Sequence, residues 1–135
     1  MTYAIEEIEG IGATHGKTLR AAGIASTEAL LGACGDRKGR TATAEKTGID
    51  AKRLLEWANR ADLMRVRGIG SEFSDLLEAA GVDTVKELAT RNAANLAVKL
   101  AEVNTAKKLT RAVPGETAVA GWIEQAKALP AMISH

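Results

Sequence analysis

The segments "IEEIEGIGATHGKTLRAAGI" (residues 5–24) and "LMRVRGIGSEFSDLLEAAGV" (residues 63–82) repeat one pattern at an offset of 58 positions. Each contains Gly-Ile-Gly, and eleven residues after its second glycine stands another glycine, preceded by Ala-Ala. The apolar residues around them recur at intervals of three and four, the spacing of one face of a helix. The pattern predicts a short helix, a tight turn whose isoleucine enters the core, and a second helix that begins at the second glycine.

Helical spacing continues through the rest of the chain. Only 3% of the residues are aromatic, and no stretch alternates strictly between apolar and polar residues, so strands are not favoured. Residues 32–41 hold three glycines and three basic residues and are expected to form an exposed, mobile loop. We predict an all-α protein of about ten short helices, over residues 4–9, 13–22, 27–33, 41–47, 51–61, 62–67, 71–80, 85–91, 93–112 (interrupted near Asn104) and 116–128.

The repeat extends beyond the two segments. Trp57 matches Trp122 at an offset of 65, which places a tryptophan-bearing helix at the end of each half. We therefore predict a duplicated unit, with one copy over residues 1–61, a second over residues 62–129 and a short tail over residues 130–135. Because small duplicated helical units usually share one core, the copies are expected to pack as one compact globule.

The composition narrows the class of function. The formal net charge is +1, so binding to nucleic acid would need a local basic patch. Cys34 is the only cysteine, which excludes an internal disulfide and favours a reducing cytoplasm. Cys34 has no partner at metal-ligand spacing, His15 and His135 lie far apart in the sequence, and no apolar run could span a membrane. We expect a non-enzymatic, cytoplasmic protein with no metal, no membrane partner and no small-molecule substrate.

Each predicted hairpin is a candidate phosphate site. A helix that begins at a tight turn exposes backbone N–H groups, and the positive end of its dipole favours anions. Basic residues lie close to both turns in the sequence. The candidate DNA-phosphate-binding residues are Gly10, Gly12, Ala13, Thr14, Lys17, Arg20, Arg65, Arg67, Gly68 and Gly70.

The segments "IEEIEGIGATHGKTL" and "LMRVRGIGSEFSDLL" resemble the helix-hairpin-helix motifs of DNA repair and recombination proteins. This resemblance implies sequence-independent contact with the DNA backbone, and it implies that a monovalent cation could bind at a hairpin. Nearly the whole chain is also similar to a bacterial family of tandem helix-hairpin-helix proteins of unassigned function. The residues that carry this second resemblance include "LLEAAGVDTVKELA" and the late "VNTAKKL" and "WIEQAK".

The charges around the two hairpins are inverted. Lys17 and Arg20 follow the first Gly-Ile-Gly, whereas Asp75 and Glu78 occupy the matching places after the second. Because neutralised phosphates drive backbone binding, the first hairpin is the better candidate for DNA. The acidic second hairpin suggests the alternative function, a protein-interaction module that docks a basic partner or a second copy of the chain.

Basic residues also cluster outside the hairpins. Residues 34–60 hold seven lysines and arginines against four acids, and residues 86–111 hold six against two. They are expected either to form one face that follows a phosphate backbone or to be an ordinary solvated surface. The candidate basic face consists of Arg37, Lys38, Arg40, Lys52, Arg53, Lys107, Lys108 and Arg111. The two tryptophans, which have apolar neighbours at helical spacing, are expected in the core rather than in contact with nucleic-acid bases.

Overall fold

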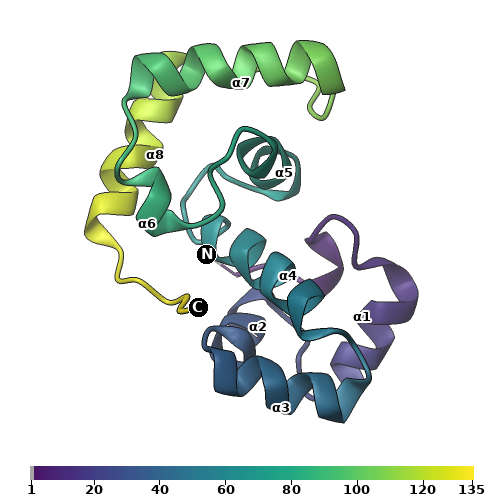
Figure 1. Ribbon diagram of the computed structural model, residues 1–135. Coiled ribbons are helices and arrows are strands. Elements are labelled where there is room, and N and C mark those ends of the chain that lie inside the picture. The colour runs from purple at the N-terminus through teal and green to yellow at the C-terminus, as the bar shows by residue number, and fades with distance from the viewer. Residues whose placement is uncertain (1) are drawn as a thin grey trace.

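The computed structural model describes residues 2–135, and these form helices joined by short turns (Figure 1). Within them lie one short 3-10 helix and eight α-helices, and no strand. The elements in chain order are η1 (Ile5–Glu7), α1 (Gly12–Ala21), α2 (Thr27–Cys34), α3 (Arg37–Thr47), α4 (Ala51–Leu63), α5 (Ser71–Ala79), α6 (Val85–Leu88), α7 (Ala93–Lys107) and α8 (Glu116–Ala128).

The all-α prediction is confirmed, but the described residues contain fewer helices than the ten expected. The predicted helix over residues 62–67 does not form, because residues 62–63 end α4 and residues 64–67 are turns. The predicted helix over residues 4–9 is the 3-10 helix Ile5–Glu7. The long helix predicted over residues 93–112 ends at Lys107. There the side-chain oxygen of Asn104 accepts from the N–H of Thr110 at 2.9 Å, and its side-chain nitrogen donates to the carbonyl of Thr110 at 3.1 Å. These two bonds turn the chain back.

Side-chain caps explain where several helices begin. Asp50 accepts a hydrogen bond from the backbone N–H of Lys52 at the start of α4, and Thr84 accepts one from Glu87 at the start of α6. Asp and Thr are both favoured at this position, because their side-chain oxygens satisfy a free N–H of the first helical turn. Ser26, Asp36 and Asn92 cap α2, α3 and α7 in the same manner.

The expectation of a mobile loop over residues 32–41 is wrong. Residues 32–34 complete α2, and α3 begins at Arg37 after only two residues. Asp36 caps α3 by accepting from the N–H of Gly39 at 2.7 Å, and Cys34 and Arg40 are buried. The glycines allow the two helices to meet closely here, because a Cβ on Gly39 would lie 2.1 Å from the carbonyl oxygen of Ala33.

The buried apolar side chains form two clusters. One cluster runs from Ile5 to Met64 and the other from Leu63 to Ala126, so two consecutive residues at the end of α4 belong to different clusters. Helices α2, α3 and α4 pack together, as do α6, α7 and α8, and α4 meets α5 between the two groups (Figure 1). We expected one shared core, and the packing has two, joined at α4 and α5.

Candidate nucleic-acid interface

The first hairpin connects η1 to α1 through a turn at Gly10 and Gly12. Both glycines have a positive φ, of 93° and 66°, while Ile11 between them is buried with 2% of its surface exposed. This is the predicted arrangement, in which the isoleucine anchors the turn. No side chain caps α1, and Gly12, Ala13 and Thr14 are exposed. The N–H groups of the first turn of α1 are therefore open to an external acceptor.

Trp57, from α4, supports the first hairpin. A Cβ on Gly10 would lie 3.8 Å from the indole Nε1, and the ring of His15 packs at 5.2 Å from the tryptophan ring. The guanidinium of Arg53 lies 6.0 Å from the same ring, at a distance that permits a cation–π interaction. Trp57 is buried, as predicted, and it brings Arg53 to the neighbourhood of the first hairpin.

The two cations expected on α1 have different surroundings. Arg20 donates two hydrogen bonds of 2.7 Å to Glu6, and these lower the pKa of the Glu6 carboxyl to about 2. The charge of Arg20 is therefore already balanced. Lys17 is exposed and makes no ion pair within residues 2–135. Of the two residues, Lys17 is the one free to neutralise a phosphate.

The second hairpin is built in a parallel manner. Gly68 has a φ of 100°, Ile69 is fully buried, and α5 begins after Gly70 without a side-chain cap. A Cβ on Gly68 would lie only 2.9 Å from the indole Nε1 of Trp122. The ring of Phe73 packs against this tryptophan at 5.3 Å, as that of His15 packs against Trp57.

The acidic residues after the second hairpin are engaged within the molecule. Arg60, from α4, makes ion pairs of 2.9 Å with Asp75 and 2.5 Å with Glu78, both on α5. It also donates to the backbone carbonyl of Glu9 at 3.3 Å, just before the first hairpin. Glu72 contacts Arg111 at 3.3 Å. The charge inversion therefore serves, in part, to join α5 to α4 and to the turn that precedes Gly10.

The arginines before the second hairpin differ in accessibility. Arg65 is mostly buried, with 14% of its side chain exposed, and it pairs with the buried Asp62 at 2.6 Å. Asp62 also accepts from the N–H of Val85 at the start of α6, so this pair has a structural role. Arg67 is exposed, and its backbone N–H and carbonyl both bind the side-chain amide of Gln125.

The candidate basic face does not form one continuous surface. Arg40 was expected on it, but only 4% of its surface is exposed, and its guanidinium donates to three backbone carbonyls. The remaining residues divide into two groups, because α3 packs against α2 and α4 while α7 packs against α5 and α8 (Figure 1). Arg37, Lys38, Lys52 and Arg53 lie on α3 and α4, and Lys107, Lys108 and Arg111 lie at and beyond the end of α7.

The structure adds one cation that the sequence did not indicate. Lys46, at the end of α3, lines a shallow hollow together with Lys17 of α1. Its ammonium group lies 3.4 Å from the carbonyl oxygen of Ala22, 24 positions earlier in the chain. No local pattern could have revealed this proximity, because it depends on how α1 and α3 pack.

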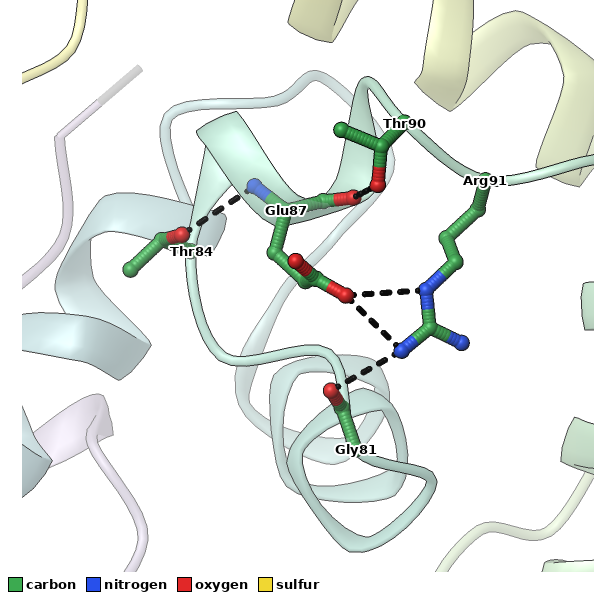
Figure 2. Close-up of polar contacts among 5 residues, drawn as sticks. All are labelled: Gly81, Thr84, Glu87, Thr90 and Arg91. Carbon is green, nitrogen blue, oxygen red and sulfur yellow. Dashed lines mark hydrogen bonds and ion pairs between the residues drawn. The ribbon is translucent and has the colours of Figure 1, made fainter.

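A polar network closes the turn after α5 (Figure 2). Arg91 donates to the Glu87 carboxylate at 2.9 and 3.1 Å and to the carbonyl of Gly81 at 3.1 Å. Thr84 caps the helix that carries Glu87, and Thr90 donates to the carbonyl of Glu87. Every side chain in this network is bonded to another member of it. The role of the network is therefore to hold α6 against the end of α5.

Neither a metal site nor a membrane span emerges from residues 2–135. Within them no three metal-ligating side chains of His, Cys, Asp or Glu gather at one place. No helix there has both the length and the apolar character needed to cross a bilayer.

Cys34 is a buried thiol. Burial raises its pKa, although a hydrogen bond with Thr43 acts in the opposite direction.

Comparison with known proteins places the chain in a family but does not supply a function. Residues 9–129 match the model of the family described as "Domain of unknown function (DUF4332)", and the chain belongs to that family. No curated protein and no solved structure matches the chain.

Proposed function

We propose that this protein binds the DNA backbone without sequence preference and without catalysing a reaction, through the first hairpin. The observation that carries the proposal is the uncapped, exposed start of α1 at Gly12, Ala13 and Thr14, with the unpaired Lys17 one turn further on. Backbone N–H groups at a helix start and a nearby ammonium group are complementary to a phosphate. Arg53, held over Trp57, supplies a second cation from α4.

We further propose that the two halves are duplicated helix-hairpin-helix units. The parallel packing supports this proposal, since in each half the indole nitrogen of the tryptophan faces the first glycine of Gly-Ile-Gly, where an added Cβ would lie 3.8 Å from it at Gly10 and 2.9 Å at Gly68. Each tryptophan ring also packs, in a tilted arrangement, against the ring at the matching position of the helix after the hairpin, His15 in one half and Phe73 in the other. Duplication followed by divergence explains why the turns are alike while the charges around them differ.

Double-stranded DNA fits this site better than single-stranded DNA does. Binding of single strands relies on exposed aromatic side chains that stack with bases. Trp57 and Trp122 are buried, and Tyr3 and Phe73 are partly buried and packed against the two cores. Contact with phosphates alone positions a protein on a duplex without reading the bases, which accounts for the expected lack of sequence preference.

The alternative function, docking of a protein partner on the acidic second hairpin, receives less support. It required free carboxylates on α5, but Asp75 and Glu78 already pair with Arg60, and Glu72 contacts Arg111. Glu72 also stands in the first turn of α5, where it disfavours a phosphate at that helix start. We therefore assign the contact with DNA to the first hairpin.

Fluorescence anisotropy with a labelled duplex at about 50 mM salt tests the proposal. We expect micromolar binding whose affinity falls steeply with added salt. Lys17→Glu should weaken binding and reduce the slope of log affinity against log salt by about one for the lost phosphate contact. Lys86→Glu, which makes the same charge change at an exposed position on α6, is the matched control and should have little effect.

Two results would refute the proposal. One is the absence of binding at low salt with tens of micromolar protein. The other is an equal loss of affinity in Lys17→Glu and Lys86→Glu, because this would indicate attraction by overall charge and not by the first hairpin.

A further inference from the structure

The C-terminal segment, residues 130–135, returns to the first half of the molecule. Figure 1 shows it running from the end of α8 to the neighbourhood of α2. Leu129, just before it, packs against the second apolar cluster, whereas Ile133 packs against the first. Residues 130–135, which we expected to form a short tail, therefore contact both halves.

The polar contacts of the segment all use its backbone. The N–H of Ser134 donates to the carbonyl of Gly35 at 2.8 Å, and the guanidinium of Arg40 donates to the carbonyl of Ser134 at 2.8 Å. Arg65 donates to the carbonyl of Pro130, also at 2.8 Å. Proteins bind extended peptides in the same manner, through hydrogen bonds to the main chain and pockets for side chains. Here main-chain groups at both ends of the segment are bonded, and the apolar side chain of Ile133 packs between them.

The surface beneath the segment is shaped to receive a backbone. A Cβ on Gly35 would lie 2.5 Å from the carbonyl oxygen of Met132, so only glycine permits this close approach. The buried Arg40 also depends on the segment. Its other hydrogen-bond acceptors are the carbonyls of Cys34 and Gly35, and the carbonyl of Ser134 completes the set. A buried cation needs such acceptors to offset its lost hydration.

The groove is larger than the segment that fills it. A mainly apolar hollow of about 500 Å³, lined by Leu31, Leu129 and Met132 among others, lies alongside and is not filled by the protein. The segment itself is weakly covered, since all of its residues except Ile133 are exposed. Its release has to break three hydrogen bonds and the packing of Ile133, and the adjoining space could take the side chains of a longer occupant.

We infer that the surface formed by Leu31, Gly35, Arg40 and Arg65 is a peptide-binding groove. Its resident ligand is the chain's own segment 130–135, which exchanges between a bound and a free state. The chemical class of ligand is a short extended peptide with an apolar side chain between two backbone carbonyls. Because the polar contacts use only backbone atoms of the segment, the apolar position decides which peptides bind. This inference does not depend on the binding of DNA.

Nuclear magnetic resonance of the isotope-labelled chain of residues 1–135 tests the inference through the variant Ile133→Asp. Loss of the apolar anchor should accelerate hydrogen exchange of the Ser134 amide by about tenfold or more. It should also shift the amide signals of Gly35 and Arg40. A synthetic peptide of residues 130–135, added to this variant, should then return those two signals toward their wild-type positions in a saturable manner.

Ala131→Asp is the matched control, because it introduces the same charge at an exposed position of the same segment. It should leave the exchange of Ser134 and the signals of Gly35 unchanged. The inference is overturned if Ile133→Asp does not accelerate exchange, or if the peptide causes no saturable shift. Should Ile133→Asp unfold the chain, Ile133→Ala provides the same test with a smaller expected acceleration, and unchanged exchange in that variant would overturn the inference as well.

Discussion

Substituting alanine at the first glycine of each hairpin should destabilise the second hairpin more than the first. Gly10 and Gly68 have similar φ values of 93° and 100°, so both substitutions incur a similar backbone strain of about 1–2 kcal/mol. Their surroundings differ. A Cβ on Gly10 would lie 3.8 Å from Nε1 of Trp57, an ordinary contact, whereas one on Gly68 would lie 2.9 Å from Nε1 of Trp122.

The close contact at Gly68 forces Trp122 to move within a packed environment. Trp122 is 5% exposed and packs against the ring of Phe73, so its own ring has little free space. Overpacking of this kind costs about 1–3 kcal/mol. We therefore expect Gly10→Ala to lower the free energy of unfolding by about 1–2 kcal/mol and Gly68→Ala by about 2–5 kcal/mol.

Urea denaturation with a common slope measures both values, and a second background isolates the cause. In a Trp122→Phe protein, which lacks the indole nitrogen, Gly68→Ala should cost about as much as Gly10→Ala does in the wild type. The difference between the two backgrounds is a coupling energy of about 1–3 kcal/mol between residues 68 and 122. Equal costs for the two glycines, or an unchanged cost in the Trp122→Phe background, would show that contact with the tryptophan does not determine the penalty.

Two further predictions concern the ion pairs around the hairpins. Arg60→Gln should lower the free energy of unfolding by about 1–3 kcal/mol, because it leaves Asp75 and Glu78 close together without their cation, and urea denaturation measures this loss. Glu6→Gln should destabilise the protein at neutral pH, because Glu6 loses its charged bonds to Arg20. Urea denaturation at several pH values measures the difference in free energy of unfolding between the variant and the wild type. This difference should fade as the pH falls from 4.5 toward 2.

The sign of the pH effect follows from the direction of the pKa shift. The folded state lowers the pKa of Glu6 from 4.5 to about 2, so the stabilisation is fully present above the unfolded value and is lost as the pH falls through the folded value. A difference that persists unchanged at pH 2 would contradict this assignment.

For Arg60→Gln, the control is Lys86→Gln, which removes one exposed positive charge. An equal effect of both variants would show that net charge, not the pairs on α5, is responsible.

The predictable part of the fold was local. The caps at Asp50 and Thr84 are local features, because each side chain bonds a backbone N–H two or three residues away. The buried isoleucines of both Gly-Ile-Gly turns and the buried tryptophans followed from helical spacing. The ends of helices were less predictable. Glycines and charges over residues 32–41 suggested a loop, but a two-residue connection held by Asp36 was sufficient.

The candidate site was predictable only in part. The sequence identified the hairpin, Lys17 and Arg53, but not that Trp57 brings Arg53 close to the turn. It could not show that Arg20 is paired with Glu6. Charge along a sequence does not reveal whether a side chain is free, because its partner can come from any element packed against it.

The sequence by itself determined the helical class, the two glycine turns and the residues that anchor them, since these depend on backbone preferences and on spacing within one or two helical turns. Tertiary structure alone decided which charges remain available. It paired Arg60 of α4 with Asp75 and Glu78 of α5, buried Arg40 beneath the C-terminal segment, and divided the apolar residues into two clusters. These contacts join residues from different helices, and the angles at which the helices pack decide which of those residues meet.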